Sequence, residues 1–158
     1  MTTVTHYTGA SPLPEAPVAS LFTRIIRGEL PGRFVWRDER AVGFLTIAPL
    51  RPGHTLVVPI EEIDHWLDVS PELMQHLTLV AQKIGQAVQR VFRPEKVGLM
   101  IAGLEVRHVH LHVVPIKSLG DLDFAKADAS ASPETLDAAA ERLRAALREA
   151  GHPEVAEK

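Results

Sequence analysis

The sequence contains no cysteine, and this absence excludes some kinds of architecture from the start. A chain of 158 residues without cysteine has neither a disulfide framework nor a cysteine-based zinc site. The absence fits a reducing compartment, so we expect a cytoplasmic location. No stretch approaches the ~18 consecutive apolar residues that span a bilayer. The N-terminus also lacks the basic start and apolar core of a secretory signal, and we expect no membrane partner.

An excess of charge of one sign is missing as well. The chain has 17 lysines and arginines against 20 aspartates and glutamates, a formal charge of −3, and its basic residues are scattered. A general nucleic-acid binder would show a basic stripe, so we expect no nucleic-acid partner. If the substrate is anionic, the positive field must be local, from histidines, backbone amides or residues such as Arg51 and Lys117.

What is present indicates one α+β domain. Hydrophobic residues make up 46% and charged residues 23% of the chain, which is typical of a soluble domain with a sizeable core. Residues 1–19 hold Thr, Ser and Pro with little apolar pattern, and we expect a flexible arm there. Residues 20–124 are predicted to form the main folded domain. Residues 125–158 are predicted to form a C-terminal helix and a solvated tail.

The predicted elements give an antiparallel sheet that carries helices on one side. Strands are expected over residues 34–37, 42–47, 54–59, 96–102 and 108–114. Helices are expected after three serines that are suited to cap a helix N-terminus, Ser20, Ser70 and Ser132. The helix after Ser70 is the longest, at about 20 residues, because apolar residues recur there at spacings of three and four until Pro94.

The most informative stretch is the run from His108 to Val114, in which three histidines alternate with aliphatic residues. Alternation favours a β-strand, whose successive side chains point to opposite faces. His108, His110 and His112 would then share one face, with imidazoles about 6.5–7 Å apart. A phosphate with its attacking and leaving groups has about this span.

Two other interpretations of the three histidines stay open at this point. A structural role is difficult to reconcile with three imidazoles on one face, because each buried ring has two nitrogens that need partners. A metal site is the stronger alternative, since two histidines two residues apart on a strand can reach one zinc or iron ion. Such a site usually recruits a third ligand, and Glu105 has the wrong parity to share the face.

A fourth histidine, His54, begins another predicted strand. The loop before it is stiffened by Pro49 and Pro52, and Gly53 permits a sharp bend. A histidine held by such a loop can orient another site residue or contact a substrate directly. Considered alone, it is more often an exposed loop residue, and that interpretation is favoured for an isolated histidine.

The run from His108 to Val114 resembles the signature of the histidine triad (HIT) family, in which three histidines alternate with apolar residues before a final apolar pair. Residues 22–31 (FTRIIRGELP) are similar to the family's opening helix and turn. Residues 44–49 and 52–59 are similar to the strands of its nucleotide pocket. The order of elements also agrees over residues 20–124, which we therefore expect to be a HIT-like nucleotide-binding domain.

The resemblance implies a five-stranded antiparallel sheet with a long helix and a short N-terminal helix packed on it, usually in a homodimer whose sheets join. It implies a nucleoside mono- or polyphosphate substrate that is cleaved at the α-phosphate through a covalent nucleotidyl-histidine, without a metal or other cofactor. The family nucleophile matches His110, and His112 matches the residue that contacts phosphate oxygens or the leaving group. His108 and His54 match the two that hydrogen-bond around the nucleophile.

The resemblance also implies that Phe22, Phe44, Thr46, Ile47 and Glu105 lie at the substrate pocket. Thr46 stands where family members usually carry an acidic residue that holds the ribose hydroxyls, so the ribose contact would be weaker. Glu105 stands where many hydrolases of the family carry a phosphate-binding hydroxyl. An ionised carboxylate there would repel a phosphate, unless it points away or meets a cationic leaving group.

Three hypotheses follow for the function. The first is a nucleotide hydrolase that cleaves a phosphoramidate or a dinucleoside polyphosphate with His110 as nucleophile. The second is a nucleotide-binding or regulatory protein with little activity, because of the departures at Thr46 and Glu105. The third is a metal site on the histidine strand. The zinc site that some bacterial relatives build from two N-terminal cysteines is not predicted, because Ser20 and Thr23 match those cysteines.

Overall fold

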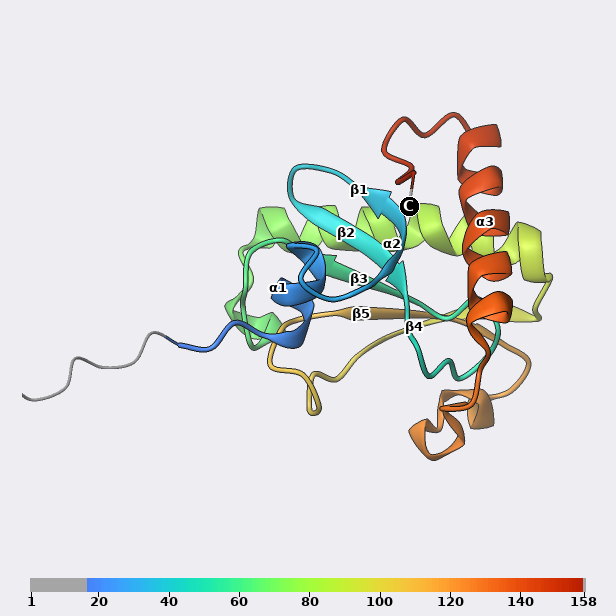
Figure 1. Cartoon of the computed structure of the whole chain (residues 1–158), viewed down its shortest axis with the longest axis horizontal. Helices are drawn as coiled ribbons and strands as arrows, with labels where there is room; N and C mark the ends of the chain where they lie inside the picture. The colour runs from blue at the N-terminus through green and yellow to red at the C-terminus, as the bar shows by residue number, and fades with distance from the viewer. Residues whose placement is uncertain (1–16, 158) are drawn as a thin grey trace, which may run out of the picture.

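The computed structural model describes residues 17–157, so the arm predicted over residues 1–19 lies almost wholly outside the described part. The elements in chain order are α1 (Leu21–Ile26), β1 (Arg33–Arg37), β2 (Ala41–Leu45), β3 (Thr55–Pro59), the 3-10 helix η1 (Trp66–Asp68), α2 (Pro71–Phe92), β4 (Lys96–Ile101), β5 (Leu111–Ile116), the 3-10 helices η2 (Leu119–Leu122) and η3 (Phe124–Lys126), and α3 (Pro133–Glu149) (Figure 1). Across residues 17–157, no helix is both long and apolar enough to cross a membrane.

The strands form one five-stranded sheet in the order β1-β2-β3-β5-β4, and every neighbouring pair is antiparallel. The predicted α+β class and five-stranded antiparallel sheet are confirmed. Strand β5 lies inside the sheet, where His112 pairs with Leu56 of β3 on one side and with Met100 of β4 on the other. Because β5 has a neighbouring strand on each side, the backbone of His112 is held in place from both sides.

The helices begin where the capping serines predict. The side chain of Ser20, Ser70 or Ser132 accepts a hydrogen bond from the backbone amide three residues later at the start of each α-helix. Helix α2 ends at Phe92, and the next residue, Arg93, adopts a left-handed conformation with φ of 47° just before Pro94. A proline cannot continue the helix, because it lacks the amide hydrogen and its ring clashes with the preceding turn.

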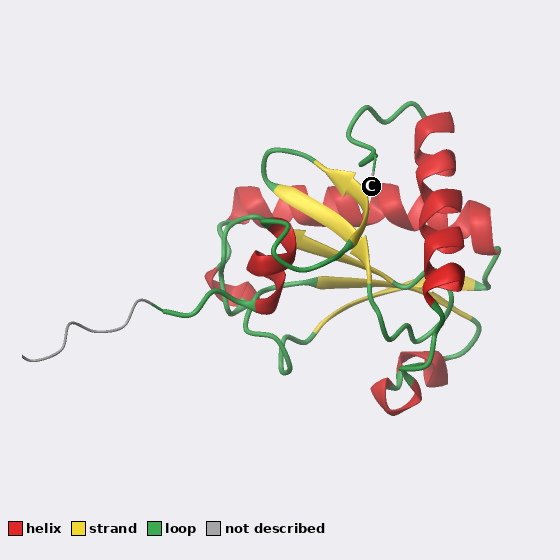
Figure 2. Cartoon of the chain, viewed as in Figure 1, coloured by secondary structure: helices red, strands yellow, loops and turns green. Residues whose placement is uncertain are grey.

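The two faces of the sheet bury different cores. One face packs against α2 and α3, and the core between them includes Val35, Val57, Leu77, Ile84, Val109, Leu111, Val113 and Leu143. The opposite face packs against α1, and the core between them includes Phe22, Phe34, Phe44, Leu56 and Val58. Figure 2 shows α2 running behind the sheet and α1 in front of it. The prediction that the helices lie on one side is wrong, because α1 presents Phe22 to aromatic and aliphatic residues of the other face.

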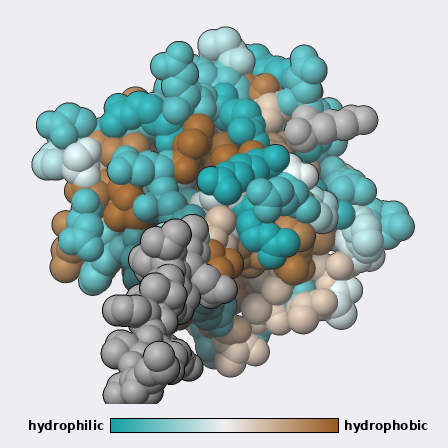
Figure 3. Space-filling view, turned by 60° about the vertical axis from the view of Figure 1, so that its left-hand side comes forward, coloured by the Kyte–Doolittle hydropathy of each residue, from teal (hydrophilic) through white to brown (hydrophobic). Residues whose placement is uncertain are grey.

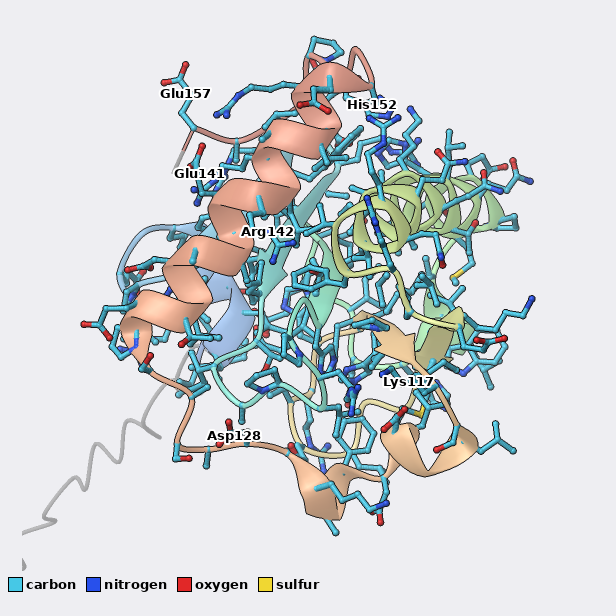
Figure 4. All side chains as sticks on the ribbon, turned by 90° about the vertical axis from the view of Figure 1, so that its right-hand side faces the viewer. Lys117, Asp128, Glu141, Arg142, His152 and Glu157 are labelled. Carbon is cyan, nitrogen blue, oxygen red and sulfur yellow. The ribbon has the colours of Figure 1, made fainter. Side chains whose placement is uncertain are left out.

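The C-terminal segment is part of the fold. Helix α3 crosses the C-terminal end of α2, where Arg142 donates to the Val91 carbonyl at 2.8 Å (Figure 4). The tail then returns to β1, and the amide of Ala156 donates to the Val35 carbonyl at 3.2 Å. Ala156 is buried, so the prediction of a solvated tail is wrong. The tail covers part of the unpaired edge of β1, whose free backbone groups need partners.

Hydrophilic side chains cover most of the face seen in Figure 3, and separate apolar patches lie between them. The described chain includes exposed apolar side chains far apart in the sequence, among them Ile47, Leu104 and Leu119. Isolated apolar residues of this kind are normal on a protein surface.

Candidate functional site

The histidine run presents its two sets of side chains to opposite faces, as the alternation predicts. Val109, Leu111 and Val113 are at most 1% exposed and lie in the core beneath α2. His110 and His112 lie on the face that α1 covers, where the rings of Phe22 and Phe124 contact them. The aliphatic set thus fixes the run on the sheet and directs the imidazoles toward the site.

Two details of the predicted strand are wrong. Strand β5 begins at Leu111, so only His112 lies within it. The amide of Val109 instead donates to the Ile63 carbonyl, and the His108 carbonyl accepts from the imidazole of His110. Because the backbone around His108 has these partners, it does not continue the hydrogen bonds that pair β5 with β3 and β4. The rings of His110 and His112 are also closer than predicted, with centroids 4.7 Å apart.

A chain of hydrogen bonds assigns the protons of His54 and His112. The backbone amide of Leu50 donates to His54 Nδ1 at 3.1 Å, so that nitrogen carries a lone pair. A neutral His54 therefore has its hydrogen on Nε2, which donates to His112 Nδ1 at 2.9 Å. The remaining hydrogen of His112 is on its Nε2. At 2% exposed, His54 is a buried member of the site and not an exposed loop residue.

The proton of His110 is assigned by the backbone. Its Nδ1 lies 2.7 Å from the carbonyl oxygen of His108, which can only accept, so Nδ1 carries the hydrogen. In the neutral ring the lone pair is then on Nε2, for which residues 17–157 supply no hydrogen-bond partner. The site therefore places an unshared lone pair on His110 beside an N–H donor on His112. This combination suits attack on an electrophile whose neighbouring atoms need a hydrogen bond.

Burial lowers the pKa of all four imidazoles below the ordinary value of about 6.5. Burial and the neighbouring His110 lower the pKa of His112 to about 4. Burial, His112 and His110 lower the pKa of His54 to about 3. Burial also lowers the pKa of His110 and of His108, although the charge of Glu105 opposes this shift at His110. The four rings are therefore neutral near pH 7, which keeps the lone pair of His110 available.

His108 holds a structural position in the site. It is fully buried, and its Nε2 donates to the Pro59 carbonyl at 2.8 Å. Its Nδ1 then accepts from the hydroxyl of Ser20 at 2.7 Å. Both ring nitrogens are engaged within the protein, so His108 fixes its neighbours and has no ring nitrogen left to bind a ligand.

The residues at the position of the family zinc site do not fit zinc. Zinc is bound by thiolate, imidazole or carboxylate, whereas Ser20 and Thr23 offer neutral hydroxyls that are already hydrogen-bonded to His108 and Glu62. Over the described range 17–157, no three histidine or acidic side chains are grouped so that they could hold a metal ion. We therefore derive no chemistry from a metal here.

Two of the predicted substrate-binding residues support the histidines from beneath. Phe22 is 5% exposed and Phe44 is 3% exposed, and their rings meet edge to face with centroids 5.5 Å apart. The ring of Phe22 also meets the imidazole of His110 edge to face at 4.9 Å. In this structure these two phenyl rings therefore fix the orientation of the imidazole from within the core.

The other three predicted substrate-binding residues lie nearer the surface. Thr46 is half-buried, and its hydroxyl oxygen accepts from the Ala48 amide at 3.3 Å. Ile47 is 74% exposed, so its side chain is free to contact a flat apolar group. Glu105 is exposed in the loop between β4 and β5, and its negative charge works to raise the pKa of His110. The structure thus brings Glu105 within electrostatic reach of the nucleophile candidate.

Sequence reasoning missed one residue of the site. Phe124 lies in η3, between the last predicted strand and the helix predicted after Ser132, and its ring meets His112 edge to face with centroids 5.0 Å apart. The segment is held from the other side, where the amide of Asp128 donates to the Pro49 carbonyl at 3.0 Å. Figure 4 shows the segment between Lys117 and Asp128 below the start of α3. The available signal was the one aromatic residue in a mostly polar stretch that also contains Leu119 and Leu122.

Comparison with known families matches residues 27–119, more than half of the chain, to the HIT domain. The Bacillus subtilis protein named Protein hit is 33% identical over 108 residues, which cover 64% of this chain and 73% of that protein. An asymmetrical bis(5'-nucleosyl)-tetraphosphatase of Schizosaccharomyces pombe is 30% identical over 98 residues, which cover 59% of this chain and 52% of that protein.

The structural comparison agrees with the sequence comparison. The crystal structure of a zinc-bound histidine triad family protein from Mycobacterium smegmatis is similar to this structure with a TM-score of 0.71 at 29% identity, and the match covers 82% of this chain and 94% of that one. The motif, the sheet that carries it and the family match all point the same way, and the protein belongs to the histidine triad family.

Proposed function

We propose that this protein is a nucleotide hydrolase in which Nε2 of His110 attacks the α-phosphorus of a nucleoside phosphate derivative. The observation that carries the proposal is the proton arrangement: the His108 carbonyl holds the hydrogen of His110 on Nδ1, so the lone pair is on Nε2. The Nε2 hydrogen of His112 is available beside it, because His54 occupies the other nitrogen. A nucleophile and a donor are thus set side by side before a substrate binds.

The reaction has two displacement steps. In the first, the bond between His110 Nε2 and phosphorus forms while the bond from phosphorus to the leaving oxygen or nitrogen breaks. The ring then carries a positive charge, which the hydrogen bond to the His108 carbonyl stabilises. In the second step water attacks phosphorus, the nitrogen–phosphorus bond breaks, and the nucleoside monophosphate and a proton are released.

The low pKa of His112 agrees with this scheme. The free site holds His112 neutral because burial and His110 disfavour a charge there. A bound anionic phosphate favours the protonated form, since an opposite charge within about 4–6 Å raises the pKa of an imidazole. The added proton takes Nδ1 of His112, so the hydrogen bond from His54 to that nitrogen breaks when His112 becomes charged. His112 can then neutralise the phosphoryl oxygens or give its proton to an amine leaving group.

The proposed substrates are nucleoside phosphoramidates or dinucleoside polyphosphates. The relative from Schizosaccharomyces pombe, a bis(5'-nucleosyl)-tetraphosphatase, supports the second class. The second candidate function is a nucleotide-binding protein with little turnover. One observation favours it. The negative charge of Glu105 works to raise the pKa of His110, so this carboxylate is near enough to repel a phosphate bound beside His110.

A quenched-reaction mass spectrum tests the first function. The protein is mixed with an adenosine phosphoramidate or with a diadenosine polyphosphate, beside His110→Ala and a control, His65→Ala, that alters an exposed histidine. We expect an acid-labile adenylyl adduct on the unsubstituted protein and on the control, and none on His110→Ala. Nucleotide binding without adduct or turnover would support the second function and refute the first.

We also propose that the protein is a homodimer, as the family resemblance implies. Strand β4 is at the edge of the sheet, and Leu99 on it and Leu79 on α2 are about half exposed. These residues line a groove of about 750 Å³ between α2 and β4. A second copy that covers the groove would bury both leucines and satisfy the free edge of β4.

Light scattering after size exclusion tests the dimer. We expect a dimer for the unsubstituted protein and for a surface control, Leu67→Glu, because Leu67 is 66% exposed and outside the groove. Leu99→Glu would place a charge in the interface and is expected to give a monomer. A monomer from the unsubstituted protein would contradict the proposal.

A further inference from the structure

Three segments that are distant in the sequence meet around the ring of His108. They are the start of α1, the connection after β3 and the segment that precedes β5. Four side chains from these segments form one hydrogen-bonded group, which we name the Ser20 cluster: Ser20, Thr23, Glu62 and His108. Thr23 and His108 are buried, whereas Glu62 is exposed.

The donors and acceptors of the Ser20 cluster have one consistent order. Thr23 donates its hydroxyl hydrogen to the Glu62 carboxylate, and the Ser20 amide donates to the same carboxylate oxygen at 3.0 Å. The Ser20 hydroxyl has one hydrogen and two nearby acceptors, Thr23 Oγ1 at 3.1 Å and His108 Nδ1 at 2.7 Å. It donates to the nearer one, His108 Nδ1, because His108 Nε2 carries the ring hydrogen and donates to the Pro59 carbonyl at 2.8 Å. These hydrogen bonds lower the pKa of Glu62, which keeps its carboxylate charged and accepting.

The cluster reaches His110 by two routes. The backbone of His108 supplies the carbonyl that accepts from His110 Nδ1 at 2.7 Å, so the position of the His108 ring determines where that carbonyl lies. The second route runs through α1. Ser20 caps this helix, and Phe22 in its first turn packs its ring against His110. The cluster therefore holds both groups that orient the imidazole of His110.

We propose that Ser20, Thr23 and Glu62 are positioning residues for His110, and that their hydrogen bonds to His108 hold the His110 ring in the tautomer and orientation needed for attack. The proposal rests on the proposed function, because it concerns His110 as nucleophile. In this proposal the exposed carboxylate of Glu62 and the hydroxyls of Ser20 and Thr23 connect α1 to His108, the first histidine of the run. An α1 helix of six residues has little stability of its own, so its place on the sheet depends on such contacts.

Two substitutions test the proposal. Thr23→Val removes the hydroxyl and keeps the shape of the side chain, and Thr23→Ser restores the hydroxyl. Glu62→Ala removes the exposed carboxylate, and Glu61→Ala, at the neighbouring exposed glutamate, is the matched control. The rate of adduct formation is measured in single turnovers with the adenosine phosphoramidate, and the affinity for adenosine monophosphate is measured separately by calorimetry.

We expect Thr23→Val and Glu62→Ala to slow adduct formation about tenfold, since a small misplacement of a reacting group costs up to about 10²-fold. The nucleotide affinity should stay within about twofold, because no substrate contact is removed. Thr23→Ser and Glu61→Ala should keep the original rate. A loss of affinity equal to the loss of rate would overturn the proposal, since it would indicate general damage to the pocket.

A second measurement does not depend on activity. The Nδ1 hydrogen of His110 is buried against a carbonyl, so its nuclear magnetic resonance signal should exchange slowly in the unsubstituted protein. We expect this signal to broaden or vanish in Glu62→Ala and to persist in Glu61→Ala. An unchanged signal together with an unchanged rate in both Thr23→Val and Glu62→Ala would refute the positioning role. If the signal responds but no variant or parent forms an adduct, the positioning role stands and the proposed hydrolase function fails.

Discussion

The stability of the fold should fall steeply on mild acidification, because burying neutral histidines opposes their protonation. His54 and His112 titrate in the unfolded chain near the ordinary pKa of about 6.5. In the folded protein burial and neighbouring imidazoles lower these pKa values to about 3 and about 4. A group with a lowered pKa in the folded state contributes its stability above the unfolded value and loses it as the pH falls toward the folded value.

The size of the effect follows from the number of protons that unfolding takes up. Near pH 5 the unfolded chain binds about two more protons at this pair than the folded protein does, so the unfolding free energy changes by about 3 kcal/mol per pH unit. Between about pH 6.5 and pH 5 the pair accounts for a loss of about 3 kcal/mol, above the range in which most carboxylates titrate. Burial also lowers the pKa of His108 and His110, so the total loss should be at least as large.

Urea unfolding followed by circular dichroism at several pH values, at constant ionic strength, measures this slope. His54→Gln keeps a donor and an acceptor at the position but cannot titrate, so the contribution of the pair should fall to about half, or about 1.5 kcal/mol over the same interval. An unfolding free energy that is flat between pH 6.5 and pH 5 would refute the reasoning. So would a His54→Gln variant whose stability falls as steeply as that of the parent.

Three further predictions concern packing and the site. Leu77→Ala should lower the unfolding free energy by about 3 kcal/mol in urea titrations because the side chain is fully buried, whereas Leu67→Ala, 66% exposed, should change it by less than about 0.5 kcal/mol. Gly53→Ala should lower both stability and turnover, because φ at this position is 95° and a Cβ would strain the loop that places His54; unchanged turnover would contradict this. Phe124→Ala should change kcat more than the affinity for adenosine monophosphate, since its ring contacts the imidazole of His112, the proposed donor to the phosphate or leaving group; a change in affinity alone would refute that role.

The sequence alone determined the features that depend on neighbouring residues. Alternation placed Val109, Leu111 and Val113 in the core and the histidines on the other face, because successive side chains of an extended chain point in opposite directions. Serines and prolines marked the starts of the α-helices, since a capping side chain and its amide partner are three residues apart. The resemblance to the family then supplied the nucleophile candidate, which local patterns cannot rank among the histidines.

Only the tertiary structure decided which nitrogen carries each proton. That assignment depends on the contact of His54 with His112, which are 58 residues apart, and on that of Ser20 with His108, 88 residues apart. The same holds for the side of the sheet on which α1 lies and for the contact of Phe124 with the site. A periodic pattern specifies which face of an element is apolar, but the partner of that face is chosen when the whole chain packs. The tautomers that define the chemistry of the site are therefore a property of the folded chain.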